Sequence, residues 1–413
     1  MSEYNHLFIN GMARSGGNLM CNMLNVNQDV MIASDPYVEL WRSMRNAFID
    51  KNASANLLRT FDPKSPIQDH YFTDERIQLM DVVLNSDIKV EFDLNNWPEL
   101  LERTIARARL DAGDLIPYLS KLKGNTYREM IDNGFEIVAK ARNGENKQWI
   151  GVKDSWTIEF LLPLARAYAD ARFIVLLRDP RAIISSMLGM KDKDPSQVAH
   201  TLSYARHWRK YATFCTYFST LPEFENRLCV LSHEQILNAP EETAQMLCSF
   251  LDIEYSPAML DTENYVDYAT GKVWQGNSAY EQVTTGISVS RATRWMDRLA
   301  PEIIKMIDFV CGPEMKLCGY QVLHDDVWPG VEVLEYVIRN HNEYSKWRSD
   351  LGDPQKDFGF ELFRKSLLAL KVENLDSHLI RKSFLFEDIF MRLQDVCAGT
   401  QEPAFQLNPV QKN

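Results

Sequence analysis

Short apolar runs alternate along this chain with stretches in which apolar residues recur at three- and four-residue spacing. The short runs predict buried strands at residues 6–9, 149–152, 172–177 and 227–231. A stretch with helical spacing follows each of them, at residues 18–24, 157–169, 180–190 and 241–251. Strands and helices that alternate in this way are typical of a parallel sheet with crossover helices on both faces. The pattern therefore predicts a three-layer α/β domain.

The segment between the first two predicted strands, about residues 42–147, is too long for a simple connection. It has helical spacing at residues 97–109 and 127–142. An insertion of this size that leaves the carboxyl edge of a sheet usually covers a ligand site. We therefore expect a helical insertion that acts as a cap.

Helical spacing returns after residue 320, at residues 331–344, 361–370 and 379–396. This pattern predicts a main domain over residues 1–320 and a helical C-terminal extension over 321–400, to which no function can be given from the pattern. Residues 401–413 are expected to be disordered.

Composition narrows the range of partners. The chain has 413 residues, of which 45% are hydrophobic, and a net charge of −12. An acidic chain of this kind is a poor general binder of nucleic acid or anionic membranes, so any anionic ligand needs a local basic pocket. The N-terminus has no signal-peptide pattern, and charged residues interrupt the most apolar stretch, residues 160–177. We expect a cytoplasmic protein without nucleic-acid or membrane partners; the pattern leaves its oligomeric state open.

A glycine-rich stretch follows the first strand and opens the first helix; it comprises Gly11, Arg14, Ser15, Gly16, Gly17 and Asn18. Backbone N–H groups of such a loop, together with a helix N-terminus, favour phosphate-like anions. The spacing of Gly11 and Gly16 equals that of a nucleotide-triphosphate P-loop, but Gly17 and Asn18 replace its lysine and hydroxyl residue. The sequence thus disfavours a kinase and predicts no metal, with Arg14 as the loop cation. The alternative is a tight turn with Arg14 as a surface charge.

A second anion site is predicted where the third strand ends. Arg178 stands at that carboxyl end, where ligands bind in open parallel sheets. Asp179 and Pro180 are typical of a helix start, and Ser186 comes about two turns along this helix, where it can face the same crevice. A guanidinium fork and a hydroxyl suit a phosphate monoester. Two anion sites suggest a ligand with separate phosphates at both ends of a nucleoside.

These motifs, in this order, resemble those of the sulfotransferase family, whose donor is 3′-phosphoadenosine-5′-phosphosulfate (PAPS). The loop from Gly11 to Gly16 is similar to the family's 5′-phosphosulfate loop, and the stretch from Arg178 to Ser186 is similar to its 3′-phosphate motif. Later stretches are similar to its C-terminal blocks, at residues 231–243, 276–278, 286–288, 294–295 and 318–320. The resemblance covers most of residues 5–320 and implies a P-loop-like fold and transfer of a sulfuryl group to a hydroxyl or amine.

The resemblance also implies catalytic roles. Sulfuryl transfer builds negative charge on the bridging oxygen of the leaving phosphate, so cations there matter more than covalent chemistry. Arg14 corresponds to the family's loop cation, and Lys153, at another strand end, is the second expected cation. Further contacts to the 3′-phosphate or adenine are expected from Asn277, Arg291 and Arg294, although a surface role for these three is nearly as plausible.

The base that takes the acceptor's proton is a carboxylate or a histidine. Cytosolic sulfotransferases have a histidine two residues after the lysine, where this chain has Ser155. Tyrosylprotein sulfotransferases, which share the Lys-Asp dipeptide, have a carboxylate about twenty residues after the loop arginine. Asp35 falls at that place and is the first choice, with Glu39 and His70 as alternatives. Asp35 also fits an ordinary turn.

The fold does not identify the acceptor. The insertion is acidic, at Asp69, Asp74, Glu75, Asp81 and Asp87. Negative charge favours a neutral or cationic acceptor over a polyanionic glycan. We expect a small hydroxylated metabolite, such as a nitrogenous natural product, with carbohydrate or protein acceptors as alternatives. A nucleotide kinase and a non-catalytic nucleotide-binding module are the alternatives of other classes.

Overall fold

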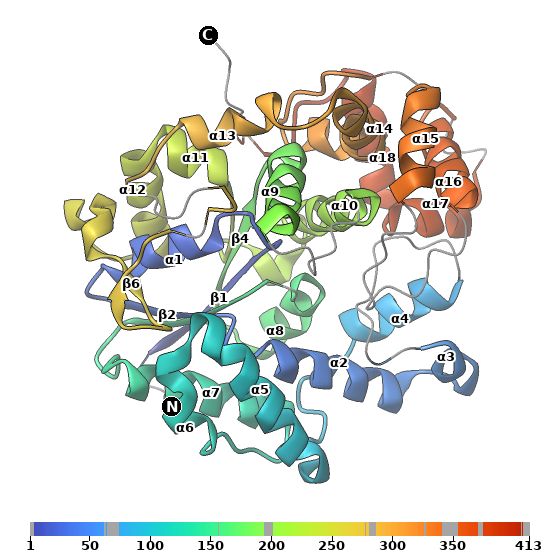
Figure 1. Cartoon of the computed structure of the whole chain (residues 1–413). Coiled ribbons are helices and arrows are strands. Elements are labelled where there is room, and N and C mark those ends of the chain that lie inside the picture. The colour runs from blue at the N-terminus through green and yellow to red at the C-terminus, as the bar shows by residue number, and fades with distance from the viewer. Residues whose placement is uncertain are drawn as a thin grey trace.

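The computed structural model describes residues 4–61, 63, 74–155, 157–193, 201–276, 278–280, 286–325, 328–340, 354–370, 375–405 and 407. Its central feature is a five-stranded parallel sheet of order β2-β3-β1-β4-β5 (Figure 1). The strands are β1 (Asn5–Gly11), β2 (Val30–Ser34), β3 (Trp149–Asp154), β4 (Arg172–Leu177) and β5 (Leu228–Ser232). The four predicted strands are confirmed with small changes at their ends, and β2 was not predicted.

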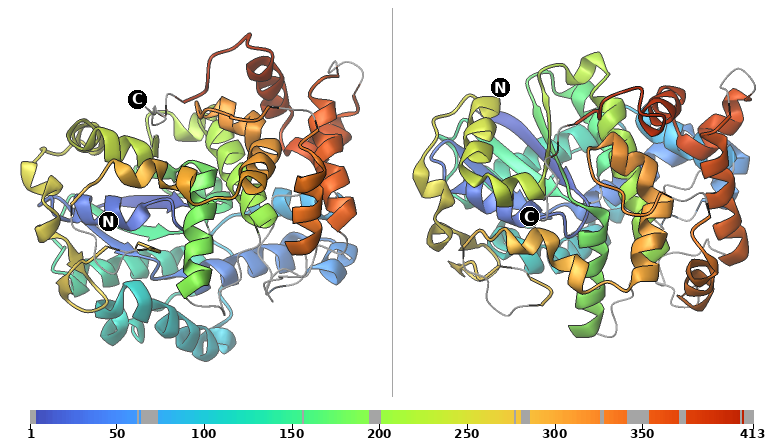
Figure 2. Two further views of the ribbon diagram at one scale, coloured as in Figure 1. Left: turned by 45° about the horizontal axis from the view of Figure 1, so that its top comes forward. Right: turned by 90° about the horizontal axis from the view of Figure 1, so that it is seen from above.

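Helices cover both faces of the sheet, which makes the fold a three-layer α/β structure, as predicted (Figure 2). Side chains of β1 alternate between two cores: Leu7 and Ile9 pack on one face, and Phe8 packs on the other. One face is covered by α1 (Gly17–Asn25), α11 (His233–Asn238) and α12 (Pro240–Leu251). The other face is covered by α7 (Tyr127–Ala141), α8 (Leu161–Ala167) and α10 (Thr201–Phe218).

The predicted insertion is a group of helices between β2 and β3, which extends below the sheet in Figure 1. Its members before α7 are α2 (Val38–Asn52), α3 (Ala55–Thr60), α4 (Asp74–Leu84), α5 (Trp97–Asp111) and α6 (Ile116–Leu119). A buried contact ties it to the sheet, because Trp41 of α2 donates its indole N–H to Asp154 Oδ2 at 2.6 Å. The predicted helices at 97–109 and 127–142 are α5 and α7.

The remaining helices follow β4 or β5 along the chain. They are α9 (Pro180–Lys193), α13 (Ser290–Thr293), α14 (Pro301–Leu317), α15 (Val331–Asn340), α16 (Pro354–Leu367), α17 (Ser377–Phe384) and α18 (Glu387–Cys397). A separate antiparallel hairpin is formed by β6 (Val266–Asp267) and β7 (Lys272–Val273). Among the described residues, no helix combines the length and the apolar character needed to cross a membrane.

Three predictions about helices and ends need correction. The predicted helix at 157–169 is a 3-10 turn at Ile158–Phe160 followed by the shorter α8. The continuous helical stretch predicted at 379–396 is wrong, because Leu385 has a φ of 67° and separates α17 from α18. Disorder from residue 401 is also wrong for the part that the structure describes. Ala404 donates its N–H to the Leu317 carbonyl, and Leu407 is buried.

Candidate active site

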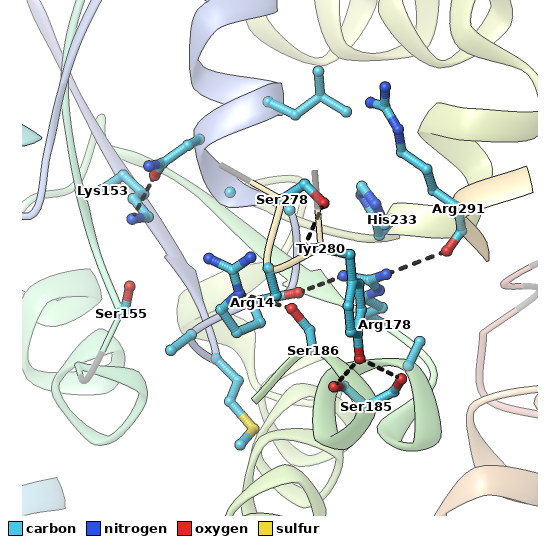
Figure 3. A pocket seen from close by; sticks show the side chains of 18 of the residues that line it. Arg14, Lys153, Ser155, Arg178, Ser185, Ser186, His233, Ser278, Tyr280 and Arg291 are labelled. Atoms are coloured by element: carbon cyan, nitrogen blue, oxygen red, sulfur yellow. Dashed lines mark hydrogen bonds between the residues drawn. The ribbon is translucent and has the colours of Figure 1, made fainter. Parts of the chain in front are cut away.

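The carboxyl ends of all five parallel strands meet at one pocket of about 250 Å³. Figure 3 shows side chains that line it, among them Arg14, Lys153 and Arg178. Each strand, or the residues directly after it, contributes a polar side chain to the lining: Arg14 after β1, Asp35 after β2, Lys153 on β3, Arg178 after β4 and His233 after β5. Ligands bind at this edge of open α/β sheets. The pocket is therefore the candidate active site, and four of these five residues were predicted from the sequence.

The loop after β1 is shaped by residues that leave no room for other side chains. Gly16 has a φ of 94°, and a Cβ built there would lie 2.1 Å from His233 Nδ1. A Cβ on Gly17 would lie 2.9 Å from Lys153 Cε. Arg14 itself has a φ of 72°, which is uncommon for a residue with a side chain. The glycines thus bring the loop backbone close to two polar side chains of the pocket.

The two predicted anion motifs pack directly against each other. Arg14 donates its Nε–H to Ser186 Oγ at 2.9 Å, and Arg178 Nη1 donates to the Arg14 carbonyl at 2.8 Å. Burial, and then the neighbouring Arg178, lower the pKa of Arg14 to about 10. Arg178 Nε is buried and has no hydrogen-bond partner. Two partly buried guanidinium groups that repel each other, one of them with a buried and unpartnered N–H, form a site that an anion would stabilise.

Arg178 is held in place by a helix that the sequence pattern did not predict. Trp208 of α10 is buried and donates its indole N–H to the Arg178 carbonyl at 2.7 Å. Arg178 Nη2 also donates to the Arg291 carbonyl, at 3.4 Å. Arg291 and Arg294 both line the pocket, as expected from the sequence. The basic side of the pocket is therefore built from β4, α9, α10 and the segment around α13.

His233 is a pocket residue to which sequence reasoning gave no role. Its side chain is buried and its Nδ1 has no hydrogen-bond partner. Burial, and then Arg178, Arg291 and Arg14, lower the pKa of His233 well below its usual value. The imidazole is therefore neutral at physiological pH. Its Nδ1 can donate or accept one hydrogen bond with a ligand, depending on the tautomer.

On the opposite side of the pocket, Lys153 and Asp35 form a buried ion pair. Lys153 Nζ also donates to Asn18 Oδ1 at 3.0 Å. Asp35 accepts from the Ser155 backbone N–H at 2.9 Å and from the Ser155 hydroxyl at 3.4 Å. Burial alone would raise the pKa of Asp35, but Lys153 and Arg107 outweigh it and hold this pKa below the usual value. Asp35 is therefore ionised at neutral pH.

The insertion adds two charged residues to the same side, and sequence reasoning missed both. Asp111, the last residue of α5, and Arg107, one turn earlier, line the pocket. Arg107 Nη2 lies 3.5 Å from Asp35 Oδ2 and also 3.5 Å from Asp111 Oδ2. Asn18 Nδ2 lies 3.4 Å from Asp111 Oδ1. The loop, β2, β3 and α5 are thus joined through one polar network.

Comparison with known proteins assigns the family. The sequence profile described as "Sulfotransferase family" matches residues 6–257, more than half of the 413 residues. This chain belongs to the sulfotransferase family. The match begins in β1 and includes all five strand ends that form the pocket, so the sulfotransferase assignment applies to the part of the chain that carries the site.

Two sulfotransferases whose names state the acceptor class match part of this chain. Protein-tyrosine sulfotransferase 1 of Danio rerio is 25% identical over 190 residues, which are 45% of this chain and 51% of that protein. Carbohydrate sulfotransferase 3 of Tetronarce californica is 27% identical over 184 residues, 41% of this chain and 40% of that protein. The matches thus span about half or less of these two relatives. Among solved structures, the sulfotransferase domain from the curacin biosynthetic pathway has 15% identity and a TM-score of 0.42, covering 73% of this chain and 93% of that chain.

Some residues expected for a sulfotransferase site lie elsewhere. Ser15 is buried under the loop, where its hydroxyl would lie 2.7 Å from a Cβ on Gly11; neither of these residues lines the pocket. Their predicted part in donor binding stays a prediction. Glu39, an alternative base, pairs with Arg42 and Arg103 and is not a pocket residue.

Two further expectations fall on residues without a described position. Asn277 and His70 lie outside the described residues, so their predicted roles stay predictions. Among the residues that are described, no group of three or more His, Cys, Asp or Glu side chains could hold a metal ion.

Proposed function

We propose that this protein transfers the sulfuryl group of PAPS to a hydroxyl of a small-molecule acceptor. The observation that carries the proposal is the pair of partly buried guanidinium groups around the loop after β1, in which Arg178 Nε has no partner and Arg14 has a lowered pKa. Such a pair needs an anion with several charges. PAPS has charged groups at both ends of a nucleoside, which suits two adjacent arginine motifs.

The residues present fit this donor. The loop from Arg14 to Asn18, closed against His233 through Gly16, would hold the 5′-phosphosulfate. Arg178 and Ser186, with Arg291 and Arg294, would hold the 3′-phosphate. The rings of Trp274 and Tyr280 line the same pocket and offer flat faces for a base. Bound PAPS would supply the activated sulfuryl group and a stable leaving phosphate.

The charged residues of the pocket would have two different roles in the transfer step. Arg14 and Lys153 would neutralise the negative charge that develops on the bridging oxygen when its bond to sulfur breaks. Asp35 would accept the proton of the acceptor hydroxyl as the new oxygen–sulfur bond forms. In the free protein Lys153 is paired with Asp35. When Lys153 turns to the donor, Asp35 loses its strongest counter-charge and becomes a better base.

The acceptor side of the pocket favours a small polar molecule. Around Asp35 the pocket presents the polar side chains of Arg107, Asp111 and Ser155. Two acidic residues of the insertion do not contribute to this side, because Asp74 and Asp81 pair with Lys382 and Arg381 of α17. The charge argument for the acceptor therefore depends on Asp35 and Asp111. The similarity to protein-tyrosine sulfotransferase 1 favours a tyrosine side chain as the second candidate.

The test is incubation of the purified protein with PAPS and two acceptor panels, hydroxylated small molecules and tyrosine peptides. We expect products heavier by one SO₃ group in the first panel. Arg14→Ala and Lys153→Ala should abolish them. Products from the peptide panel alone would show that the acceptor is a tyrosine side chain and not a small molecule. Turnover of ATP with magnesium, or no product together with no binding of 3′-phosphoadenosine-5′-phosphate (PAP), would contradict the proposal itself.

A further inference from the structure

Asp111 occupies a position that the proposed transfer reaction does not yet use. It ends α5, the helix of the insertion whose last turn enters the pocket, and it lines the pocket beside Asp35. Its side chain is 26% exposed, whereas that of Asp35 is 5% exposed. A molecule that enters the pocket to reach Asp35 can therefore touch Asp111.

The positive charge around Asp111 is incomplete. Arg107 Nη2 is shared between Asp111 and Asp35 at 3.5 Å from each, longer than a good charged hydrogen bond. The amide of Asn18 reaches Asp111 Oδ1 only at 3.4 Å. Lys153 is committed to Asp35 and Asn18. In agreement with this geometry, burial, and then Asp35, raise the pKa of Asp111 above its usual value.

A carboxylate accepts hydrogen bonds and donates none, so its best complement is a cationic donor. We propose that Asp111 selects the acceptor by binding a protonated amine, so that the substrates are amino alcohols or amino phenols whose hydroxyl reaches Asp35. This inference rests on the proposed sulfuryl transfer and deepens it by naming the acceptor class. Asp111 is a specificity residue here, and Arg107 competes with the amine of the acceptor for both carboxylates.

A purely structural role of Asp111 predicts different behaviour. If Asp111 served only to attach the end of α5 to Asn18, its loss would loosen the loop. The affinity for the donor and for every acceptor would then fall to a similar extent. If Asp111 instead binds the amine, its loss lowers the affinity only for acceptors that carry an amine. Matched acceptor pairs separate the two roles, because the members of a pair differ only in that group.

The experiment measures kcat and KM with tyramine and 4-ethylphenol, and with glucosamine and glucose. With the unaltered protein, the amine member of at least one pair should have a kcat/KM about tenfold or more above that of its partner. Asp111→Asn should raise KM for that amine about tenfold more than it raises KM for the neutral partner. Asp111→Glu should restore the preference. Glu102→Gln removes an exposed carboxylate from the same helix and should leave it unchanged.

A second variant predicts a change of opposite sign. Arg107→Met removes the competing cation and should lower KM for the amine several-fold. A loss that is equal for both members of each pair in Asp111→Asn, or transfer without any preference for amines by the unaltered protein, would overturn this inference and leave sulfuryl transfer intact. Failure of the unaltered protein to sulfate any acceptor would instead refute the proposed function.

Discussion

Gly16 lies where the loop after β1 comes closest to His233, and its missing side chain sets the width of the pocket there. Two separate effects exclude other residues: the φ of 94°, and the 2.1 Å that would separate a Cβ from His233 Nδ1. The backbone effect alone costs about 1 to 2 kcal/mol for a residue with a Cβ. The steric effect acts on the ligand site itself, because His233 has to move.

Gly16→Ala should therefore lower PAP affinity by about tenfold or more, since the displaced imidazole enters the space of the anion. Gly271→Ala is the matched control: Gly271 has a φ of 72°, but nothing lies within 4 Å of its added Cβ. It should lower the melting temperature slightly and leave PAP binding unchanged. Calorimetric titration with PAP measures both. Equal affinities of the two variants would show that the contact with His233 does not shape the site.

Asp35→Asn tests the base directly. Turnover should fall by about 100-fold to 10,000-fold, because an amide cannot accept the acceptor's proton. The same change removes a negative charge beside Lys153, so PAP should bind as tightly as before or more tightly. Full turnover of the variant would exclude Asp35 as the base, and loss of PAP binding would indicate a structural role.

Sequence patterns identified residues at or shortly after the carboxyl end of a strand, because local chemistry and the common edge of a parallel sheet are enough to place them together. Arg14, Lys153 and Arg178 are of this kind. Asp111 and Arg107 could not be found in this way, since they enter the pocket only through the fold of the insertion. Their one sequence signal is an acidic and a basic residue one helical turn apart, which also occurs on many exposed helices.

At the scale of elements, strand β2 shows a limit of hydrophobic patterning. Its five residues include only a short apolar run, and methionine and alanine within it do not favour strands. The hydrogen bonds to β3 over Val30 to Ser34 stabilise the extended conformation that local preference does not favour. The junction of α17 and α18 is similar, because the local sequence pattern does not predict the positive φ of Leu385. In both places tertiary contacts decide the backbone.

Helix α16 is fastened to α10 by a buried ionic cluster. Glu361 accepts from Arg206 Nε and from Arg209 Nη1, both at 2.6 Å, and Arg206 also pairs with Asp357. By contrast, the pair between Asp81 of α4 and Arg381 of α17 is partly exposed on both sides. Burial makes the first contact costly to break and solvent makes the second one weak.

Glu361→Gln should lower the free energy of unfolding by about 3 to 5 kcal/mol, because two buried guanidinium groups lose a counter-charge. Asp81→Asn, the matched change at the exposed pair, should cost less than about 1 kcal/mol. Urea unfolding of both variants measures the difference. Similar costs would mean that the cluster around Glu361 contributes no more than a surface pair.

The same cluster predicts a dependence on pH. Burial would raise the pKa of Glu361, but Arg209 and Arg206 outweigh it and lower the pKa from 4.5 to about 2. A lowered folded-state pKa stabilises the fold above the unfolded value and is lost as the pH falls. The protein should therefore lose about 3 kcal/mol from this group between about pH 4.5 and pH 2. Glu361→Gln should lack this part of the acid sensitivity.

At the scale of the whole molecule, the C-terminal extension shares the core of the sulfotransferase fold. Val333, Val337 and Phe358 belong to the same hydrophobic core as the sheet residues Phe8 and Phe173. Figure 2 shows these later helices packed along one end of the molecule, next to α10 and α14. The family profile ends at residue 257, so family resemblance alone does not reveal this dependence.

The proposed main domain, residues 1–320, should therefore not fold by itself. Without α15 to α18, apolar faces of α10 and α14 are exposed, and Glu314 loses its buried partner Arg364. A chain that ends at residue 407 keeps Leu407 and its buried contacts and is the matched control. Thermal unfolding and PAP binding of both truncated chains provide the measurement. The shorter chain should show no cooperative transition, and the longer one should match the full chain. Native-like melting and PAP binding by residues 1–320 would mean instead that the extension is a separate addition to a self-sufficient sulfotransferase domain.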